Sequence, residues 1–502
     1  MSEMLSLYAA AFAEVMSWDI ILLCLIGTVL GIFFGASPGM TSSMGIALIL
    51  PVTYGMDLIH GMSILLGIYI GSISGGLITA ILINIPGTPA SVATTFDGHP
   101  MAMRGEAGRA IRVGTFYSLL GGMFSLIALF TISPILAAWA LKFSYEEYFA
   151  IATMSLTLIA SLSGKSLVKG LVSAMIGLIA STVGMAPVDT ARRYTLGFYQ
   201  LDGGFKLISI MIGIYAVTEV IKVATAGEVD QKQAVLHKTR GVGVSWKEFK
   251  SQLKNFFASA CIGTGIGILP GLGAAISNLL AYSFCKNTSK NPEKFGTGCI
   301  DGLVASETAN NAVSGGALIP LLTMGIPGDA GTTMLLAAFM LHGITPGPLL
   351  FQTNGNVIYA MFVILIVANI FMFVVQQYGL GLFLKMLKIP KNILLPIVMV
   401  LASIGAFAMN NRIFDIWAIL IFAVIGWAMS KYEFPAAPIV LGFVLGPIIE
   451  TNFRRGMMSS YGNFLGFFNR PISGVVLWIT IAILAFQIGK QVFVGIRRRK
   501  NN

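Results

Sequence analysis

The sequence predicts an all-α protein that crosses a membrane many times and is built from two related halves with interrupted helices. Hydrophobic residues make up 56% of the 502 residues, charged residues make up only 11%, and the mean hydropathy is +0.83. A soluble globular domain carries about 25% charged residues. The composition therefore excludes a soluble protein and predicts a polytopic membrane protein.

Short signatures of glycine and proline occur twice along the chain, in the same order and at nearly constant separation. They are Gly35-x-x-Pro38-Gly39, Ser74-Gly75-Gly76 and Ile85-Pro86-Gly87, then Gly267-x-x-Pro270-Gly271, Ser314-Gly315-Gly316 and Ile326-Pro327-Gly328. A bilayer tolerates a broken helix only where protein or a water-filled cavity surrounds the freed backbone groups. Paired breaks in two halves are typical of secondary transporters. We therefore expect two repeats, inverted relative to each other, with broken helices or re-entrant hairpins.

The apolar stretches predict the order of the helices. At about 20 residues per span, we expect about twelve to fourteen apolar segments. The longer ones are 18–34, 59–83, 111–138, 147–163, 166–186, 205–225, 311–325, 356–386, 393–408, 413–430, 436–450 and 471–495, and the shorter ones are 40–54, 256–285 and 331–342. The first repeat would occupy 1–230 and the second 255–502. The basic segment 231–254 between them is expected to be a cytoplasmic linker or an amphipathic surface helix.

The net charge of +11 indicates topology more than a binding partner. Positive residues lie in short loops and at the C-terminus, in Arg497 to Lys500, where the positive-inside rule predicts cytoplasm. The first seventeen residues contain Glu3 and Glu14 but no lysine or arginine, so we expect the N-terminus outside and no cleaved signal peptide. No nucleic-acid partner is expected, because no soluble domain carries a basic patch.

Cysteine and histidine are scattered and predict neither a metal site nor a cofactor. The four cysteines contain no C-x-x-C pair, and no histidine stands at ligand spacing from them. We expect four free buried thiols. They are Cys24, Cys261, Cys285 and Cys299.

The first break in each half is expected to help hold an anion. Proline removes a backbone donor and glycine permits unusual dihedrals, so a helix ends there and can restart. A restarted helix presents unpaired N–H groups and the positive end of its dipole, which can bind a carboxylate without any arginine. The expected substrate-binding residues here are Gly39, Thr41, Ser42, Ser43, Gly271 and Gly273.

The second break differs between the halves by one charge. Thr88 is expected to cap a new helix that begins at Pro89, and Asp329 takes the same capping position in the second half. We call the residues at the second break of each half a tip. A neutral tip suits an anionic substrate, whereas a tip with a carboxylate and carbonyl oxygens suits a cation such as Na⁺. We assign the substrate to Gly87, Thr88 and Ser91 and the ion to Gly328, Asp329 and Thr332. Packing alone would explain any single Pro-Gly pair, but not four at matched positions.

Glu307, Asn310 and Asn311 have the spacing of residues on one face of a helix. A charge facing lipid is costly, so we expect this face to line a polar path. The alternative is a loop at the membrane interface. We assign Asn310 and Asn311 to the substrate, and Glu307, together with Asn84, to the ion.

Four motifs resemble the large permease subunit of the bacterial tripartite tricarboxylate transporters, over almost the whole chain. They are Gly35-x-x-Pro38-Gly39, Asn84-Ile-Pro-Gly-Thr-Pro, Glu307-x-x-Asn310-Asn311 and Gly325-Ile-Pro-Gly. The family usually has a proline and an alanine where this chain has Ser306 and Thr308, which leaves open a helix break before Glu307. The signature positions carried over are Pro38, Gly39, Pro86, Gly87, Glu307, Asn310, Asn311, Pro327 and Gly328.

The resemblance implies that a periplasmic solute-binding protein delivers a carboxylate to this permease in the bacterial inner membrane. It also implies a small four-helix membrane subunit as the third component, and uptake driven by ion gradients. Cargo in the family ranges over citrate-like, dicarboxylic and aromatic acids.

The sequence as a whole therefore predicts secondary active, ion-coupled uptake of a di- or tricarboxylate or a related organic anion, with Na⁺ as the expected ion. By analogy with other broken-helix transporters, we expect an elevator-like movement of the motif-bearing core against a scaffold that forms a homodimer. The alternatives are an intramembrane enzyme that uses Asp329 or Glu307 and an uncoupled anion channel. An enzyme would need a nucleophile and a base within reach, or a metal, and the sequence contains no H-E-x-x-H pair.

Overall fold

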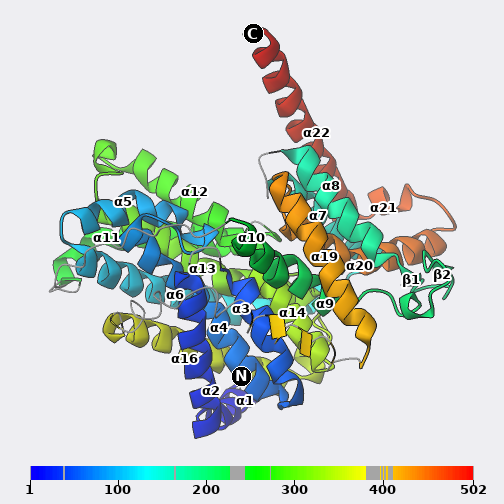
Figure 1. Ribbon diagram of the computed structural model, residues 1–502, viewed down its shortest axis with the longest axis horizontal. Coiled ribbons are helices and arrows are strands. Elements are labelled where there is room, and N and C mark those ends of the chain that lie inside the picture. The colour runs from blue at the N-terminus through cyan, green and yellow to red at the C-terminus, as the bar shows by residue number, and fades with distance from the viewer. Residues whose placement is uncertain are drawn as a thin grey trace. The chain divides into compact units, whose positions relative to one another are not determined.

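The computed structural model describes residues 2–37, 40–162, 166–226, 244–271, 273–379 and 411–500, with single residues between 381 and 407. Almost all of these residues are helical, and the strands β1 (Gly184–Met185) and β2 (Arg192–Arg193) are short (Figure 1). Among the described residues, six helices are long and apolar enough to cross a membrane. They are Trp18–Ala36, Leu58–Ile83, Ala107–Ala140, Gly355–Tyr378, Ile413–Lys431 and Pro471–Gly489. The predicted all-α, multi-pass fold is confirmed.

The chain forms two compact units, each made of two separate stretches. Unit 1 comprises Met1–Ala138 and Glu219–Met409, and unit 2 comprises Trp139–Thr218 and Asn410–Asn502. Each unit draws on both halves of the sequence. The compact units therefore do not follow the two predicted repeats, whose boundaries stay a prediction.

Unit 1 holds the four predicted breaks. Its elements are α1 (Ser2–Val15), α2 (Trp18–Ala36), α3 (Ser42–Ile49), η1 (Leu50–Gly55), α4 (Leu58–Ile83), η2 (Pro89–Ser91), α5 (Val92–Met103), α6 (Ala107–Ala140), α10 (Thr218–Ala226), α11 (Trp246–Ile268), α12 (Gly273–Thr288), η5 (Pro292–Lys294), α13 (Ile300–Met324), α14 (Ala330–Leu341), α15 (Leu350–Thr353) and α16 (Gly355–Tyr378). The last two residues of α6 and the first residue of α10 belong to unit 2.

Helices α4 and α13 form the centre of unit 1. Every residue of α4 from Gly61 to Leu82 is buried, and so is every residue of α13 from Gly302 to Thr323. Both helices carry serine and threonine among their apolar residues. Protein, not lipid, therefore surrounds the polar groups of these two helices.

Glycines let two pairs of helices approach closely in unit 1. Between α2 and α4, a Cβ added at Gly67 would lie 2.6 Å from the carbonyl oxygen of Cys24. Between α11 and α13, a Cβ added at Gly267 would lie 2.7 Å from the carbonyl oxygen of Val313. Small residues of this kind are typical of helix contacts inside membranes. In each half, the helix before the first break packs on the helix before the second.

Two segments differ in detail from the sequence expectations. Helix α13 begins at Ile300, well before the expected 311, because its polar residues are buried in protein and hydropathy does not detect them. Residues 246–254 of the expected linker form the start of α11, which Ser245 caps. The apolar segment 393–408 lies mostly outside the described residues.

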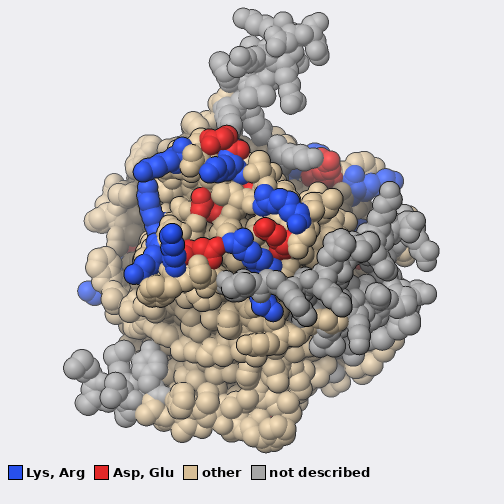
Figure 2. Space-filling model, turned by 90° about the vertical axis from the view of Figure 1, so that its left-hand side faces the viewer, with Lys and Arg blue, Asp and Glu red and all other residues tan. Residues whose placement is uncertain are grey.

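One end of unit 1 is rich in charged side chains. Figure 2 views the side on which α5 and α11 lie in Figure 1 and shows basic and acidic residues gathered above a broad uncharged surface. Arg109 pairs with Glu248 at the start of α11. Arg104 donates to the carbonyl oxygen of Gly298 at 2.6 Å. These contacts connect the α5–α6 link with α11 and with the segment before α13.

Unit 2 consists of helices with one small hairpin. Its elements are α7 (Tyr145–Leu162), α8 (Leu167–Ser181), β1, β2, η3 (Tyr199–Leu201), α9 (Leu207–Met211), the π-helix η4 (Ile212–Val217), α19 (Ile413–Lys431), α20 (Ala437–Ser459), α21 (Gly466–Asn469) and α22 (Pro471–Lys500). Strands β1 and β2 are antiparallel, with Gly184 opposite Arg193. The Arg193 guanidinium donates to both oxygens of Glu450 on α20, at 2.6 and 3.1 Å.

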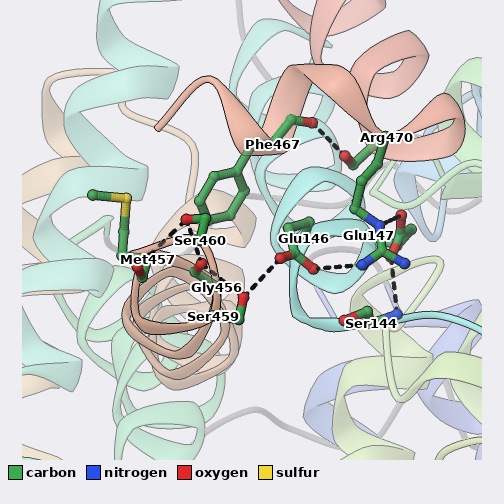
Figure 3. Close-up of polar contacts among 10 residues, drawn as sticks. Ser144, Glu146, Glu147, Gly456, Met457, Ser459, Ser460, Phe467 and Arg470 are labelled. Carbon is green, nitrogen blue, oxygen red and sulfur yellow. Dashed lines mark hydrogen bonds and ion pairs between the residues drawn. The ribbon is translucent and has the colours of Figure 1, made fainter. Parts of the chain in front are cut away.

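Two neighbouring carboxylates of α7 share one guanidinium in unit 2. Glu146 and Glu147 are 5% and 3% exposed, and both side chains point toward Arg470 (Figure 3). The Arg470 Nε lies 2.8 Å from Glu147, and its Nη1 lies 3.2 Å from Glu146. The hydroxyl of Ser459 also donates to Glu146, at 2.9 Å. The cluster joins the start of α7 to α20 and to the start of α22.

Replacing Arg470 by alanine is expected to destabilise the protein, because it leaves two buried carboxylates without their cation. Arg470 is 42% exposed and solvent screens it, so we expect a loss of about 1–3 kcal/mol, less than for a fully buried pair. Thermal unfolding in detergent measures the effect. Arg455→Ala is the control, since Arg455 lies only over the ring of Tyr145. Equal losses in the two variants would contradict this interpretation.

Candidate functional site

Each of the four signature segments interrupts a helix, as the sequence predicts. Helix α2 ends at Ala36 before α3, and α4 ends at Ile83 before η2 and α5. In the second half, α11 ends at Ile268 before α12, and α13 ends at Met324 before α14. Pro38 and Gly39 lie outside the described residues. The predicted breaks are confirmed, although the relation of the two halves as repeats stays a prediction.

The second break has the same backbone plan in both halves. The helix ends in a left-handed residue, Asn84 with φ 55° and Gly325 with φ 71°. Helices commonly end in a residue of this conformation, which is usually glycine and sometimes asparagine. An Ile-Pro-Gly sequence follows, and then a capping residue starts the next helix, Thr88 in the first half and Asp329 in the second. The predicted cap by Asp329 is confirmed. Thr88 occupies the predicted capping position, but its hydroxyl makes no hydrogen bond there within the described residues.

The two breaks of each half contact one another through glycines. A Cβ added at Gly87 would clash with the carbonyl oxygen of Gly35. At the matched position, a Cβ added at Gly328 would lie 2.6 Å from the carbonyl oxygen of Gly267. The N–H of Gly271 also donates to the carbonyl oxygen of Gly328, at 2.7 Å. The second break therefore rests on the end of the helix that precedes the first break.

Contacts also cross from one half to the other. Helix α3 packs on α14, where a Cβ added at Gly331 would lie 3.1 Å from the hydroxyl of Ser42. Helix α12 packs on η2, where the Asn278 amide donates to the carbonyl oxygen of Ala90. Within the second half, a Cβ added at Gly273, at the start of α12, would lie 3.6 Å from the Cβ of Asp329. The four restarted helices thus meet in one region of unit 1, which we call the break region.

The second tip of the break region, Gly328 to Thr332, holds a carboxylate among hydroxyl and N–H donors. One Asp329 oxygen accepts from the N–H of Thr332 at 2.6 Å and from its hydroxyl at 2.8 Å. The other oxygen accepts from the hydroxyl of Tyr69 at 3.1 Å. Tyr69 belongs to α4 and is fully buried. Within the described residues, no lysine, arginine or histidine pairs with Asp329.

The first tip, Gly87 to Ser91, is neutral. The hydroxyl of Ser91 donates to the carbonyl oxygen of Thr88 at 2.9 Å. The hydroxyl of Thr88 is buried and has no hydrogen-bond partner within the described chain. The same is true of Thr79, whose oxygen would lie 2.7 Å from a Cβ added at Gly87. Buried polar atoms are normally bonded, so these two hydroxyls are available to a ligand.

The remaining predicted residues of the first break lie at the start of α3. Thr41 caps this helix, and its hydroxyl accepts from the N–H of Met44 at 3.3 Å. Ser43 is buried. Asn84 is exposed at the end of α4. The structure places Ser42 beside Gly331 of the second tip, whereas η2, which contains Ser91, packs on α12.

Glu307, Asn310 and Asn311 lie inside α13 and are all buried. The Asn310 amide donates to the carbonyl oxygen of Ile73 on α4, and the Asn311 amide donates to the carbonyl oxygen of Glu307, each at 3.1 Å. The helix runs unbroken through this motif, which excludes the interface loop and a break before Glu307. The carboxylate of Glu307 accepts from Thr94 on α5 and from Ser118 on α6.

Asp97 is a buried carboxylate that the sequence did not single out. One of its oxygens accepts from the N–H groups of Gly296, Gly298 and Cys299, at 2.9, 2.8 and 2.7 Å. The other oxygen accepts from the hydroxyl of Tyr282 at 2.9 Å. This clamp connects α5, which follows the first tip, with the α12–α13 link. An acidic residue near a basic loop gives no sequence signal for such a role.

Replacing Asp97 by alanine is expected to loosen the α12–α13 link, because three N–H groups lose their acceptor. Gly296 is exposed and Gly298 and Cys299 are partly exposed, so water can replace part of the lost bonding, and we expect a total loss of about 1–3 kcal/mol. Trypsin cleavage at Lys290 and Lys294, both exposed, measures the loosening. Asp97→Asn keeps one acceptor oxygen and should be cleaved more slowly than Asp97→Ala. Unchanged cleavage of Asp97→Ala would show that the clamp does not hold the link.

The described residues contain no group of three or more His, Cys, Asp or Glu side chains able to hold a metal ion. All four cysteines are free. Cys24 and Cys285 are buried, but Cys261 is exposed and Cys299 is partly exposed, so the expectation of four buried thiols is wrong for these two. Cys261 lies on α11, and Cys299 is the residue before α13.

Comparison with known proteins identifies relatives over nearly the whole chain. Residues 21–441 match the model of a family described as the tripartite tricarboxylate transporter TctA family. A protein of Agrobacterium vitis is 33% identical over 488 residues, which cover 97% of each chain. Its name is "uncharacterized 52.8 kDa protein in TAR-I ttuC' 3'region".

A second Agrobacterium vitis protein, named "uncharacterized protein in TAR-II ttuC' 3'region", is 38% identical over 215 residues. The match covers 43% of this chain and 89% of the relative. No solved structure matches the chain.

Proposed function

The chain belongs to the tripartite tricarboxylate transporter TctA family, and from this premise we propose that it takes up a di- or tricarboxylate or a related organic anion by coupling to a cation gradient. The single observation that carries the proposal is the meeting of four helix breaks, with one neutral tip and one acidic tip. Such a site offers an anion backbone N–H groups and hydroxyls, and offers a cation a carboxylate and carbonyl oxygens.

The substrate anion binds at the first tip in this proposal. Its carboxylate accepts hydrogen bonds from the unpaired hydroxyls of Thr88 and Thr79 and from N–H groups at the start of the restarted helix. Gly87 has no side chain, which lets the first tip pack against the backbone of Gly35 and Gly76. Asn310 and Asn311 belong to α13, which lies between the first tip and the second tip in the sequence. We place them beside the substrate path.

The coupling cation, which we propose to be Na⁺, binds at the second tip. Asp329 supplies the charge, and Thr332 and the carbonyl oxygen of Gly328 supply further oxygen ligands. Because the two tips differ in charge, one cycle can bind cargo and ion side by side without a basic side chain. Energy stored in the ion gradient then drives uptake.

The division of the chain supports an elevator-like mechanism. Unit 1 contains all four breaks, and unit 2 contains none of them. We propose that unit 1 is the moving core and that unit 2 belongs to the scaffold, which forms a homodimer. We further propose the bacterial inner membrane as its location, with the C-terminus in the cytoplasm and the N-terminus in the periplasm. The partners are a small membrane subunit and a periplasmic solute-binding protein.

The enzyme alternative has one local feature in its favour and more against it. Gly35, Ser37 and Gly39 have the G-x-S-x-G spacing of a nucleophile elbow. However, Ser37 follows a helix rather than a strand, and its hydroxyl donates to the carbonyl oxygen of Phe33 at 2.8 Å. A nucleophilic serine instead needs a base as its hydrogen-bond partner.

Uptake into proteoliposomes tests the proposal. We expect radiolabelled citrate or another carboxylate to accumulate only with an inward Na⁺ gradient, with the small subunit present, and faster when the binding protein is added. Flux that merely equalises the two sides would identify a channel. Chemical conversion of the carboxylate by the purified protein would identify an enzyme.

A further inference from the structure

We propose a second cation-binding site in unit 1, formed by Glu307, Thr94 and Ser118, which takes a monovalent cation of the size of Na⁺. This inference rests on the proposed function. The sequence grouped Glu307 with Asp329 as ligands of one ion. The structure instead gives the two carboxylates separate surroundings, and each can therefore hold its own cation.

The two carboxylates are well separated. Tyr69 bonds to Asp329, and its hydroxyl lies 3.5 Å from the carbonyl oxygen of Ser314 on α13. Glu307 lies two helical turns before Ser314 on the same helix, or about 10 Å along the axis. No hydrogen-bond partner of Glu307 is a partner of Asp329. One small cation cannot bridge both.

Oxygen atoms from three helices surround Glu307. Thr94 of α5 and Ser118 of α6 donate to its two carboxylate oxygens, the latter at 2.9 Å. The hydroxyl of Ser306 lies 3.4 Å from that of Thr94. One turn further along α13, the side-chain oxygen of Asn310 is buried and has no partner within the described residues. Oxygen ligands of this kind, with one carboxylate, suit a hard cation.

A bound cation would compensate the charge of ionised Glu307. Glu307 is fully buried, and its two hydroxyl donors are neutral. An unpaired charge inside a membrane protein is costly and marks an ion path by default. The titratable groups on the helices around it are Asp97 and His99 on α5, Arg109, Arg112 and Tyr117 on α6, and Asp301 on α13. In the part of the chain that the structure describes, none of them forms an ion pair or hydrogen bond with Glu307.

The position of this site suits a coupling role. Thr94 lies in the first turn of α5, directly after the first tip, and Glu307 lies on the central helix of the second half. A cation bound to both would hold the substrate tip against α13. Release of this cation would free α5, so its occupancy and the geometry of the first tip are linked.

Equilibrium binding of ²²Na⁺ to the purified protein, without substrate, tests the proposal. We expect the wild type to bind two ions per chain, and Glu307→Gln, Thr94→Val and Ser118→Ala to lose one of them or to bind it at least tenfold more weakly. Asp329→Asn should lose the other ion. Ser63→Ala is the matched control, since this buried hydroxyl bonds only to the carbonyl oxygen of Ile59 in its own helix.

The outcomes separate this inference from the proposed function. A single ion that Asp329→Asn removes and that Thr94→Val and Ser118→Ala leave unchanged would overturn the second site but leave Na⁺-coupled uptake intact. A second result would also overturn it. In this result, raising the pH in Na⁺-free buffer releases a proton from the wild type but not from Glu307→Gln, and no ²²Na⁺ binds at this site. Absence of any Na⁺-dependent uptake by the wild type would instead contradict the proposed function. The two hydroxyl variants keep the carboxylate, so the test does not depend on Glu307→Gln folding.

Discussion

Replacing Gly87 by valine is expected to reduce carboxylate uptake to background while the protein still inserts into the membrane. A Cβ at this position would clash with the carbonyl oxygen of Gly35 and lie 2.9 Å from the Cα of Gly76. Both neighbours are backbone, which cannot rotate away as a flexible side chain can. Overpacking costs about 1–3 kcal/mol and occasionally more. A clash with backbone belongs at the upper end of this range, which corresponds to a roughly 100-fold loss of the closed first tip. Initial uptake rates in proteoliposomes measure the effect.

The chain offers a matched control for this variant. Gly265 lies in α11, and a Cβ added there meets no atom within 4 Å. Gly265→Val should therefore transport at close to the wild-type rate. Gly328→Val should behave like Gly87→Val, because the added Cβ would lie 2.6 Å from the carbonyl oxygen of Gly267. Normal uptake by Gly87→Val, at equal protein levels, would show that the first tip serves packing only.

Replacing Asp329 by asparagine is expected to weaken the response to Na⁺ far more than the response to substrate. The amide oxygen can still accept from the N–H of Thr332, so the helix cap survives. The charge is lost, however, and a contact to a charged group contributes about 1.5–3 kcal/mol, against about 0.5–1.5 kcal/mol for a neutral one. We expect the half-saturating Na⁺ concentration to rise by about 10- to 100-fold. The substrate KM at saturating Na⁺ should change by less than about 3-fold.

A carboxylate elsewhere in unit 1 provides the comparison. Asp19 at the start of α2 pairs with His60 at 2.8 Å, outside the break region. Asp19→Asn should leave the Na⁺ dependence unchanged. If Asp329→Asn and wild type respond equally to Na⁺, the cation does not bind at the second tip, and the charge difference between Thr88 and Asp329 has another purpose.

Local chemistry allowed the breaks and caps to be predicted from sequence. Proline and glycine act on their own backbone, the Asp329 side chain accepts from Thr332, and the Thr88 backbone bonds to the hydroxyl of Ser91, each three positions away. These effects need no tertiary information. The same reasoning identified the six long apolar helices, since a bilayer imposes their length and composition.

Other parts of the site depend on which helices pack together, and the sequence does not specify this. Tyr69 looks like any aromatic residue in an apolar helix until α4 is placed beside Asp329. Thr94 and Ser118 look like hydroxyls bonded to their own helix, as Ser63 in fact is. Hydropathy also underestimated α13, because its polar residues face protein on all sides. The division into two units follows from packing between distant stretches and not from the repeated motifs.

The discontinuous make-up of unit 1 has a consequence for its biogenesis. The ribosome completes Met1–Ala138 before it has begun Glu219–Met409, and at about 5–20 residues per second the delay until the unit is whole is on the order of ten seconds to a minute. During this interval the hydroxyl of Tyr69 and the carboxylate of Asp97 are already made, but Asp329 and the N–H groups of Gly298 and Cys299 are not. The nascent chain must therefore shelter polar groups inside or beside the translocon until the later helices arrive.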